Sequence, residues 1–185
     1  MSRIYISGVS GSGKTAACRL LIQQHSEINF INSSQLLLEL TGLKDSRQLK
    51  DLSPSILENI RQNIFPKTFN QYPNLIVDGH LNLIQEMVNC FDTFINIEAQ
   101  TEKILSNRNS EPQRIRSTEI ADIDSEINQY RNKLELMKSK FNIKPITIHN
   151  EGSLEDLANR IYAAYCNSEI NKEVRNEISH KNKEF

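Results

Sequence analysis

The sequence predicts an α/β fold in which a five-stranded parallel sheet lies between two layers of helices. Short apolar runs rich in β-branched residues alternate along the chain with longer segments whose apolar residues recur at helical spacing. The run at 74–78 is apolar between its polar ends, which is typical of a central strand buried on both faces. Strands that alternate with helices pair in parallel through right-handed crossovers. With 185 residues and no internal repeat, the chain is expected to form one domain with a sizeable core.

The five strands are predicted from the apolar runs at residues 4–6, 28–31, 74–78, 94–97 and 145–148. A helix is predicted at 16–22, directly after the first strand. The next helix begins at the capping residues 32–34 and ends at Gly42. A third helix begins at Ser53, a good N-cap, with Pro54 at its first position.

The second half of the chain predicts three further helices, at residues 101–108, 118–140 and 153–165. The long middle helix carries an apolar stripe, and the last one begins with Ser153 as its N-cap. Beyond residue 167 the sequence becomes polar and charged. We therefore expect a domain over residues 1–167 and a polar tail, a frayed helix or a disordered segment, over 168–185.

The stretch Gly8–Thr15 (GVSGSGKT) fits the phosphate-binding P-loop pattern and lies between the first strand and the first helix, as this loop requires. Its glycines allow backbone N–H groups to turn toward a phosphate, and the helix that follows presents its positive end to the same anion. Lys14 can reach the β- and γ-phosphates, and the Thr15 hydroxyl can ligate Mg²⁺. The sequence therefore predicts a site for ATP and Mg²⁺.

A second group of candidate residues follows the strand at 74–78. In open α/β sheets, ligands bind at the carboxyl ends of the strands, so Asp78 and His80 should face the site. Asp78 is expected to act on Mg²⁺, its waters or the acceptor, although it could also cap the turn after its strand. The turn at 150–153 lies where backbone groups could contact a purine.

Composition excludes several classes of function. The chain has 22 Lys and Arg against 23 Asp and Glu, which argues against duplex nucleic acid as the main partner. Its three cysteines are widely spaced and form no C-x-x-C pair, so free thiols and a cytoplasmic protein are expected. No apolar run approaches the ~20 residues of a membrane span. A GTPase base-reading motif is also missing, since Asn132–Glu135 lies inside a predicted helix and ends in the wrong acid.

At these residues the chain resembles the P-loop nucleoside monophosphate kinases, and within them the archaeal-type adenylate kinases and related short-lid proteins. The similarity runs from residue 4 to about residue 165. Its best markers are the P-loop, the strand end Val77–His80 and Arg114–Arg116 as the remnant of a lid. The resemblance implies a three-layer P-loop NTPase fold with an acceptor-binding insert at about 33–70 and a short lid at about 109–117. It also implies transfer of the ATP γ-phosphate to a nucleoside monophosphate, with AMP as the expected acceptor.

The expected site residues fall into four groups, because phosphoryl transfer depends on positioning and on positive charge around the phosphates. The expected catalytic residues are Lys14, Asp78, Arg108, Arg114, Arg116 and Arg131. Those expected to bind the nucleotide are Gly8, Ser10, Gly11, Ser12, Gly13, Lys14, Thr15, Asn150 and Gly152. Those expected to bind the acceptor are Ser33, Arg47, Arg61, Asp78 and His80, and the Mg²⁺ ligands are Thr15 and Asp78.

Two other functions stay open at this point. The first is an ATPase switch in which hydrolysis acts on a protein partner, because proteins of the resembled branch can also hydrolyse ATP. The second is a kinase of another small metabolite, which would use the same donor chemistry with a differently shaped insert. Small-molecule nucleotides remain the expected ligands, and a membrane is not.

Overall fold

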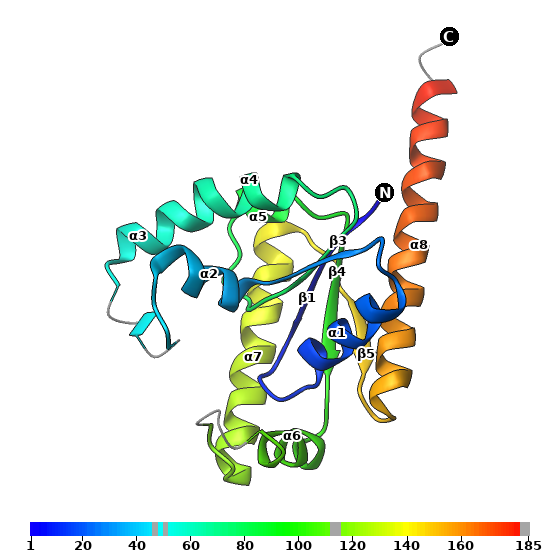
Figure 1. The fold of residues 1–185 in the computed structure, drawn as a ribbon. Coiled ribbons are helices and arrows are strands. Elements are labelled where there is room, and N and C mark those ends of the chain that lie inside the picture. Colours follow the sequence, from blue (N-terminus) through cyan, green and yellow to red (C-terminus); the bar gives the residue numbers. More distant parts are fainter. Residues whose placement is uncertain (46–47, 50–51, 112–115, 182–185) are drawn as a thin grey trace.

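The computed structural model describes residues 1–45, 48–49, 52–111 and 116–181, with the side chains of 171–181 left aside. It confirms the predicted class: all strands are parallel and form one sheet in the order β2-β3-β1-β4-β5, with helices on both faces (Figure 1). The strands are β1 (Arg3–Gly8), β2 (Asn29–Asn32), β3 (Leu75–Asp78), β4 (Thr93–Glu98) and β5 (Ile146–His149).

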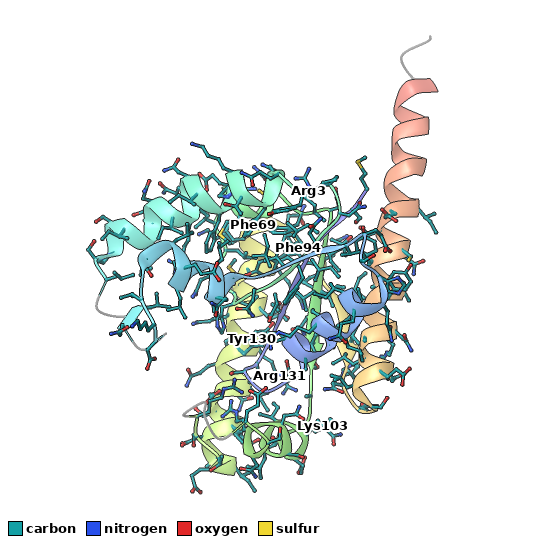
Figure 2. All side chains as sticks on the ribbon, in the orientation of Figure 1. Arg3, Phe69, Phe94, Lys103, Tyr130 and Arg131 are labelled. Atoms are coloured by element: carbon teal, nitrogen blue, oxygen red, sulfur yellow. The ribbon has the colours of Figure 1, made fainter. Side chains whose placement is uncertain are left out.

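The two larger apolar clusters of the core lie one on each face of the sheet, and a third, of Val9, Ile104 and Ile123, lies where the P-loop meets α6 (Thr101–Asn109) and α7 (Ile120–Phe141). Successive residues of a strand point to opposite faces, so Ile4 and Ile6 of β1 pack on one side and Tyr5 on the other. The first side is covered by α1 (Lys14–Gln24) and α8 (Leu154–Lys181), and the second by α4 (Phe65–Asn70), α5 (Gln85–Val88) and α7 (Ile120–Phe141) (Figure 1). Phe69 of α4 and Phe94 of β4 both pack on the second side (Figure 2).

The strand register brings the polar strand ends together. Ile6 of β1 pairs with Asp78 of β3, and Asn32 of β2 pairs with the same aspartate. The P-loop leaves β1 only two residues after Ile6, at Gly8. The carboxyl ends of β1, β2 and β3 therefore lie at one edge of the sheet, which is where open α/β sheets bind their ligands.

The predicted insert begins with α2 (Ser33–Thr41). As predicted, Asn32 caps this helix by accepting a hydrogen bond from the Gln35 backbone N–H at 2.9 Å, and Gly42 ends it with φ 68°. Ser53 caps α3 (Pro54–Asn59), which continues through a π-helical turn at Ile60–Ile64 into α4. The predicted single α-helix is therefore interrupted. Pro66 lacks an N–H and cannot complete the α-helical ladder there, which accounts for the wider turn.

The C-terminal half differs from prediction at two places. The short helix α5 was not predicted, and α8 extends through Lys181, well beyond the residues first assigned to it. Ser168, just past the predicted domain boundary at 167, is buried, and its hydroxyl lies 2.8 Å from Ser2 Oγ and 2.7 Å from Thr93 Oγ1. The last helix projects past the sheet at its C-terminal end (Figure 1). The remaining helix is α6 (Thr101–Asn109).

Two predictions about chemical class can be checked against the fold. Cys18, Cys90 and Cys166 are all free thiols, as predicted. Among the described residues, no helix combines the length and apolar character needed to cross a membrane.

Gly79, directly after β3, occupies a position without space for a side chain. A Cβ there would overlap the Tyr5 hydroxyl, which donates a hydrogen bond to the His80 carbonyl at 2.7 Å, and would lie 2.8 Å from Ser33 Oγ. We expect Gly79→Ala to lower the free energy of unfolding by about 1–3 kcal/mol, as overpacking does. Urea denaturation measures the change. Gly152→Ala is the matched control, since its Cβ would meet only the flexible Asp156 side chain, and equal losses in both variants would contradict the prediction.

Candidate active site

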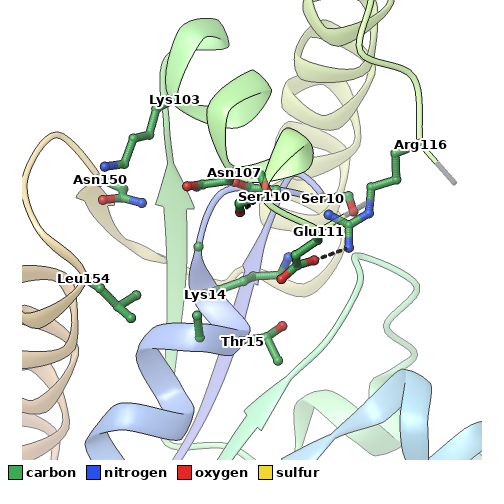
Figure 3. A pocket seen from close by; sticks show the side chains of 13 residues that line it. Ser10, Lys14, Thr15, Lys103, Asn107, Ser110, Glu111, Arg116, Asn150 and Leu154 are labelled. Atoms are coloured by element: carbon green, nitrogen blue, oxygen red, sulfur yellow. Dashed lines mark hydrogen bonds and ion pairs between the residues drawn. The ribbon is translucent and has the colours of Figure 1, made fainter. Parts of the chain in front are cut away.

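A cavity of about 280 Å³ opens against the P-loop, and we call it the P-loop pocket (Figure 3). Ser10, Lys14 and Thr15 line it from the loop and from the start of α1. Asn107 and Arg116 line it from α6 and the lid segment, and Asn150 and Leu154 from the region between β5 and α8. Of the residues predicted to bind the nucleotide, Ser10, Gly11, Gly13, Lys14, Thr15 and Asn150 line this pocket.

The loop keeps its shape because Gly13, its last glycine, is the N-cap of α1 in the left-handed region, with φ 90°. A Cβ at Gly13 would lie 2.7 Å from Asn150 Nδ2, so the position excludes any side chain. The Ser12 N–H donates to the Val9 carbonyl at 3.0 Å and closes the turn. This curvature is the one needed to direct backbone N–H groups at a phosphate.

Side chains from distant parts of the sequence hold three successive carbonyl groups of the loop. Arg108 donates to the Ser10 oxygen at 2.9 and 3.2 Å, and Asn107 donates to the Gly11 oxygen at 2.8 Å. Asn150 donates to the Ser12 oxygen at 2.8 Å. In a trans peptide the N–H lies opposite the carbonyl. Holding the carbonyls of Ser10 and Ser12 therefore turns the N–H groups of Gly11 and Gly13, two residues of the pocket wall, in the other direction.

Lys14 supplies positive charge to the P-loop pocket. Its residue surface is only 7% exposed, and its ammonium group donates to the Val9 carbonyl at 3.4 Å. Lys14 is also the first residue of α1, where the helix dipole adds further positive potential. An anion in this pocket would meet the ammonium group and the positive end of the helix together.

Asp78 and Thr15, the two predicted Mg²⁺ ligands, lie in contact with each other. The Thr15 hydroxyl donates to Asp78 Oδ2, and Asn32 Nδ2 donates to the same oxygen at 2.8 Å. No cluster of three or more His, Cys, Asp and Glu side chains occurs among the described residues. One carboxylate and one hydroxyl nevertheless fit Mg²⁺, which keeps several waters and takes further ligands from substrate phosphates. Sequence reasoning missed Asn32 in this group, because it was predicted only as a helix cap.

The structure places the predicted arginines very differently. Arg116 lines the P-loop pocket and forms an ion pair with Glu111 at 3.3 Å (Figure 3). Arg108 is 3% exposed and lies behind the loop rather than in the pocket, so its position does not fit the predicted contact with phosphates. Arg131 is exposed on α7 and lines neither pocket described here (Figure 2). Arg47 and Arg114 lie outside the described residues.

The remaining predicted residues surround the loop. Gly8 lines a second pocket, and Ser12 is fully buried, with no hydrogen-bond partner for its hydroxyl among the described residues. Gly152 lies outside the P-loop pocket, but its carbonyl accepts a hydrogen bond from Lys103 at 3.1 Å. Ser33 is buried, and its hydroxyl lies beside Gly79. The Tyr5 hydroxyl lies beside the same glycine, and the charge of Arg61 acts to lower the pKa of Tyr5.

The second pocket, of about 240 Å³, lies between the P-loop, the end of β3 and α7, and we call it the α7 pocket. Gly8, Val9 and Ser10 line it from the loop, and His80, Leu81 and Asn82 from the segment after β3. The α7 residues are Glu126, Gln129, Tyr130 and Lys133. Sequence reasoning missed these four. Their spacing of i, i+3, i+4 and i+7 on a long helix is the signal that one face of α7 is shared.

The α7 pocket is polar, and Lys133 adds positive charge to it. Desolvation by the surrounding protein and the charge of Lys14 lower the pKa of His80, although part of its surface stays exposed. A neutral imidazole can both donate and accept a hydrogen bond at neutral pH. Burial raises the pKa of Tyr130, whose hydroxyl lies 2.7 Å from Asn96 Oδ1 and 2.9 Å from Ser7 Oγ.

The parallel sheet and the glycine-rich loop after its first strand together have the arrangement of a P-loop fold. A family model described as an AAA domain matches residues 7–125, more than half of the chain. The protein therefore belongs to this AAA domain family. A comparison with curated proteins finds no match.

Several solved kinase structures share the fold. Shikimate kinase from Acinetobacter baumannii, in complex with shikimate, matches with a TM-score of 0.65 and 15% identity over 90% of this chain and 94% of that one. Shikimate kinase from Aquifex aeolicus matches with 0.58 and 17% over 91% and 98%. A gluconokinase from Sinorhizobium meliloti matches with 0.55 and 12% over 94% and 97%. At such identities the likeness establishes the fold alone.

Proposed function

We propose that this protein is an ATP-dependent kinase that phosphorylates a small acceptor molecule. The observation that carries the proposal is that two pockets meet at one residue of the P-loop: Ser10 lines both the P-loop pocket and the α7 pocket. A group-transfer enzyme must bring donor and acceptor together at one phosphate, and this arrangement offers a place for each. Membership of a P-loop family supports the donor side.

The P-loop pocket would hold ATP. Lys14 would contact its terminal phosphates, and Thr15 and Asp78 would hold Mg²⁺, which neutralises charge on the phosphates when bound. An acceptor oxygen would form a bond to the γ-phosphorus while the bond from this phosphorus to the β–γ bridging oxygen breaks, with ADP as the leaving group. A hydroxyl acceptor would release its proton to water. Arg116, at the edge of the same pocket, is placed to exchange its partner Glu111 for a phosphate oxygen.

The α7 pocket fits an acceptor that is small and negatively charged. Its volume of about 240 Å³ is modest, and none of the residues that line it comes from the insert at 33–70. Lys133 would pair with an anionic group, while His80 and Gln129 would hydrogen-bond to hydroxyl groups. A shikimate kinase in complex with shikimate and a gluconokinase share the fold, so small hydroxylated acids are the first acceptors to test.

A nucleoside monophosphate is the second candidate acceptor. The insert beside β3 favours it, because Ser33 and the charge of Arg61 lie near the strand end that carries Asp78 and His80. A nucleotide would have to extend from the α7 pocket over these residues. The Asp78-x-His80 strand end that resembles adenylate kinases also supports this candidate.

An acceptor screen tests the proposal. The protein is incubated with MgATP and, separately, with shikimate, gluconate, AMP, CMP, UMP and GMP, and ADP is measured against a reaction without acceptor. We expect one class of acceptor to raise the rate of ADP formation and to carry the new phosphate. Phosphorylated AMP without phosphorylated hydroxy acid would favour the second candidate. A rate that no acceptor changes would overturn the kinase and favour an ATPase that acts on a partner.

Lys133→Met tests the acceptor pocket. Removal of one charged hydrogen bond should raise the KM for the acceptor about tenfold while the KM for ATP changes little. Lys138→Met is the matched control, because Lys138 lies on the same helix but pairs with Glu135 at 2.8 Å and lines neither described pocket. An equal effect of the two substitutions would mean that the α7 pocket does not hold the acceptor.

A further inference from the structure

The side chain of Arg108 joins three parts of the site from behind. Its guanidinium donates to the Ser10 carbonyl through Nε and one terminal nitrogen, and to the Ser117 carbonyl at 2.7 Å through the other. Both terminal nitrogens also pair with the Glu126 carboxylate, at 2.5 and 3.2 Å. The arginine side chain is 1% exposed, whereas the Glu126 side chain is 42% exposed, so the guanidinium is buried while its carboxylate partner still meets water.

Each of the three partners belongs to a different part of the site. Ser10 is the P-loop residue shared by the two pockets, and Glu126 is a wall residue of the α7 pocket. Ser117 follows directly after Arg116, the lid arginine of the P-loop pocket. A movement of Glu126 or of Ser117 would therefore shift Arg108, and with it the Ser10 carbonyl that Arg108 holds.

The Ser10 carbonyl matters because it fixes the peptide that it shares with Gly11. While the carbonyl points to Arg108, the Gly11 N–H points away from it, and Gly11 lines the P-loop pocket. Without a donor behind the loop, this peptide could rotate and present its carbonyl oxygen to an incoming phosphate. Oxygen facing oxygen would repel the ligand, so the orientation of the peptide affects phosphate affinity directly.

We propose that Arg108 is a positioning residue that holds the P-loop in the conformation that binds a nucleotide phosphate. The same side chain links the P-loop to Glu126 of α7 and to Ser117. It acts through the Ser10 peptide and does not contact the transferred phosphate. The inference rests on the proposed function only in taking the ligand of the P-loop to be a nucleoside di- or triphosphate.

Binding of MgADP to Arg108→Met, measured by titration calorimetry, tests this role. ADP lacks the γ-phosphate, so its affinity reports on the P-loop without any contact to the transferred group. We expect Arg108→Met to weaken MgADP binding about tenfold or more, as loss of a charged hydrogen bond does. Arg108→Lys, which keeps the charge and can still reach one partner, should recover part of the affinity. An unchanged MgADP affinity together with a lower transfer rate would show direct catalysis and overturn the proposal.

Thr101→Val is the matched control. Thr101 Oγ1 donates to Asp124 Oδ1 at 2.5 Å, a second link between α6 and α7 that does not touch the P-loop. Loss of this hydrogen bond in Thr101→Val should lower Tm without changing MgADP affinity. If Thr101→Val weakened MgADP binding as much as Arg108→Met does, Arg108 would have only a general structural role. If Arg108→Met does not fold, Arg108→Lys and Glu126→Gln decide the question, and wild-type affinity in both overturns the proposal. Failure of the acceptor screen, with MgADP binding and its dependence on Arg108 intact, would remove the kinase but leave the positioning role.

Discussion

Replacing Lys14 by methionine is expected to reduce the rate of phosphoryl transfer by about 10²–10³-fold, the effect of removing one preorganised donor from such a site. The ammonium group lies in the wall of the P-loop pocket at the positive end of α1, where charge develops on the transferring phosphate. Methionine has a similar length and no charge, so it fills the same space among buried neighbours. Steady-state ADP formation with saturating acceptor measures the change in kcat.

Lys67→Met is the control for this substitution, since Lys67 is an exposed lysine on α4 that lines neither described pocket. Thermal unfolding of both variants would show whether the fold is kept. Transfer at the wild-type rate in Lys14→Met would contradict the assignment of the donor site.

Asp78→Asn is expected to cause the second largest loss, about 10²-fold in kcat, together with a higher Mg²⁺ concentration for half-maximal activity. Asp78 is 2% exposed and accepts hydrogen bonds from Thr15 and Asn32. Asparagine keeps the shape, but it removes the negative charge that attracts the cation. Activity measured over a series of Mg²⁺ concentrations at fixed ATP checks both effects.

Asp92→Asn provides a matched control at the opposite end of the strands, where β1 and β4 begin. Asp92 accepts a hydrogen bond from the Arg3 backbone N–H at 2.9 Å, at the start of β1 and β4. Its Mg²⁺ dependence should equal that of the wild type. The metal assignment fails if Asp78→Asn also shows the wild-type dependence.

The sequence predicted those parts of the protein that depend on local patterns. All five strands, the P-loop between β1 and α1 and the strand end at Asp78 were confirmed, because short periodicity and glycine spacing define them. The caps at Asn32 and Ser53 were confirmed for the same reason.

Features that depend on contacts between distant residues were missed. Arg108 and Ser10 are 98 positions apart, and nothing near Arg108 in the sequence indicates that its guanidinium turns inward instead of toward a phosphate. Asn107, which holds the Gly11 carbonyl, was not singled out, because asparagine is common on helix surfaces. The polar face of α7 with Gln129 and Lys133 was also missed, since charged positions on a long helix usually face solvent.

The three side chains that hold P-loop carbonyl groups also determine how late in synthesis all the parts of this loop's surroundings become available. The segment Gly8–Thr15 leaves the ribosome early, whereas Asn150, which holds the Ser12 carbonyl, is translated 138 residues after Ser12. The backbone N–H of Asn150 itself donates to the Glu98 carbonyl at 2.7 Å, beside the end of the paired strands β4 and β5. A growing chain thus carries the whole P-loop sequence long before the last of the three side chains that hold its carbonyl groups has been made.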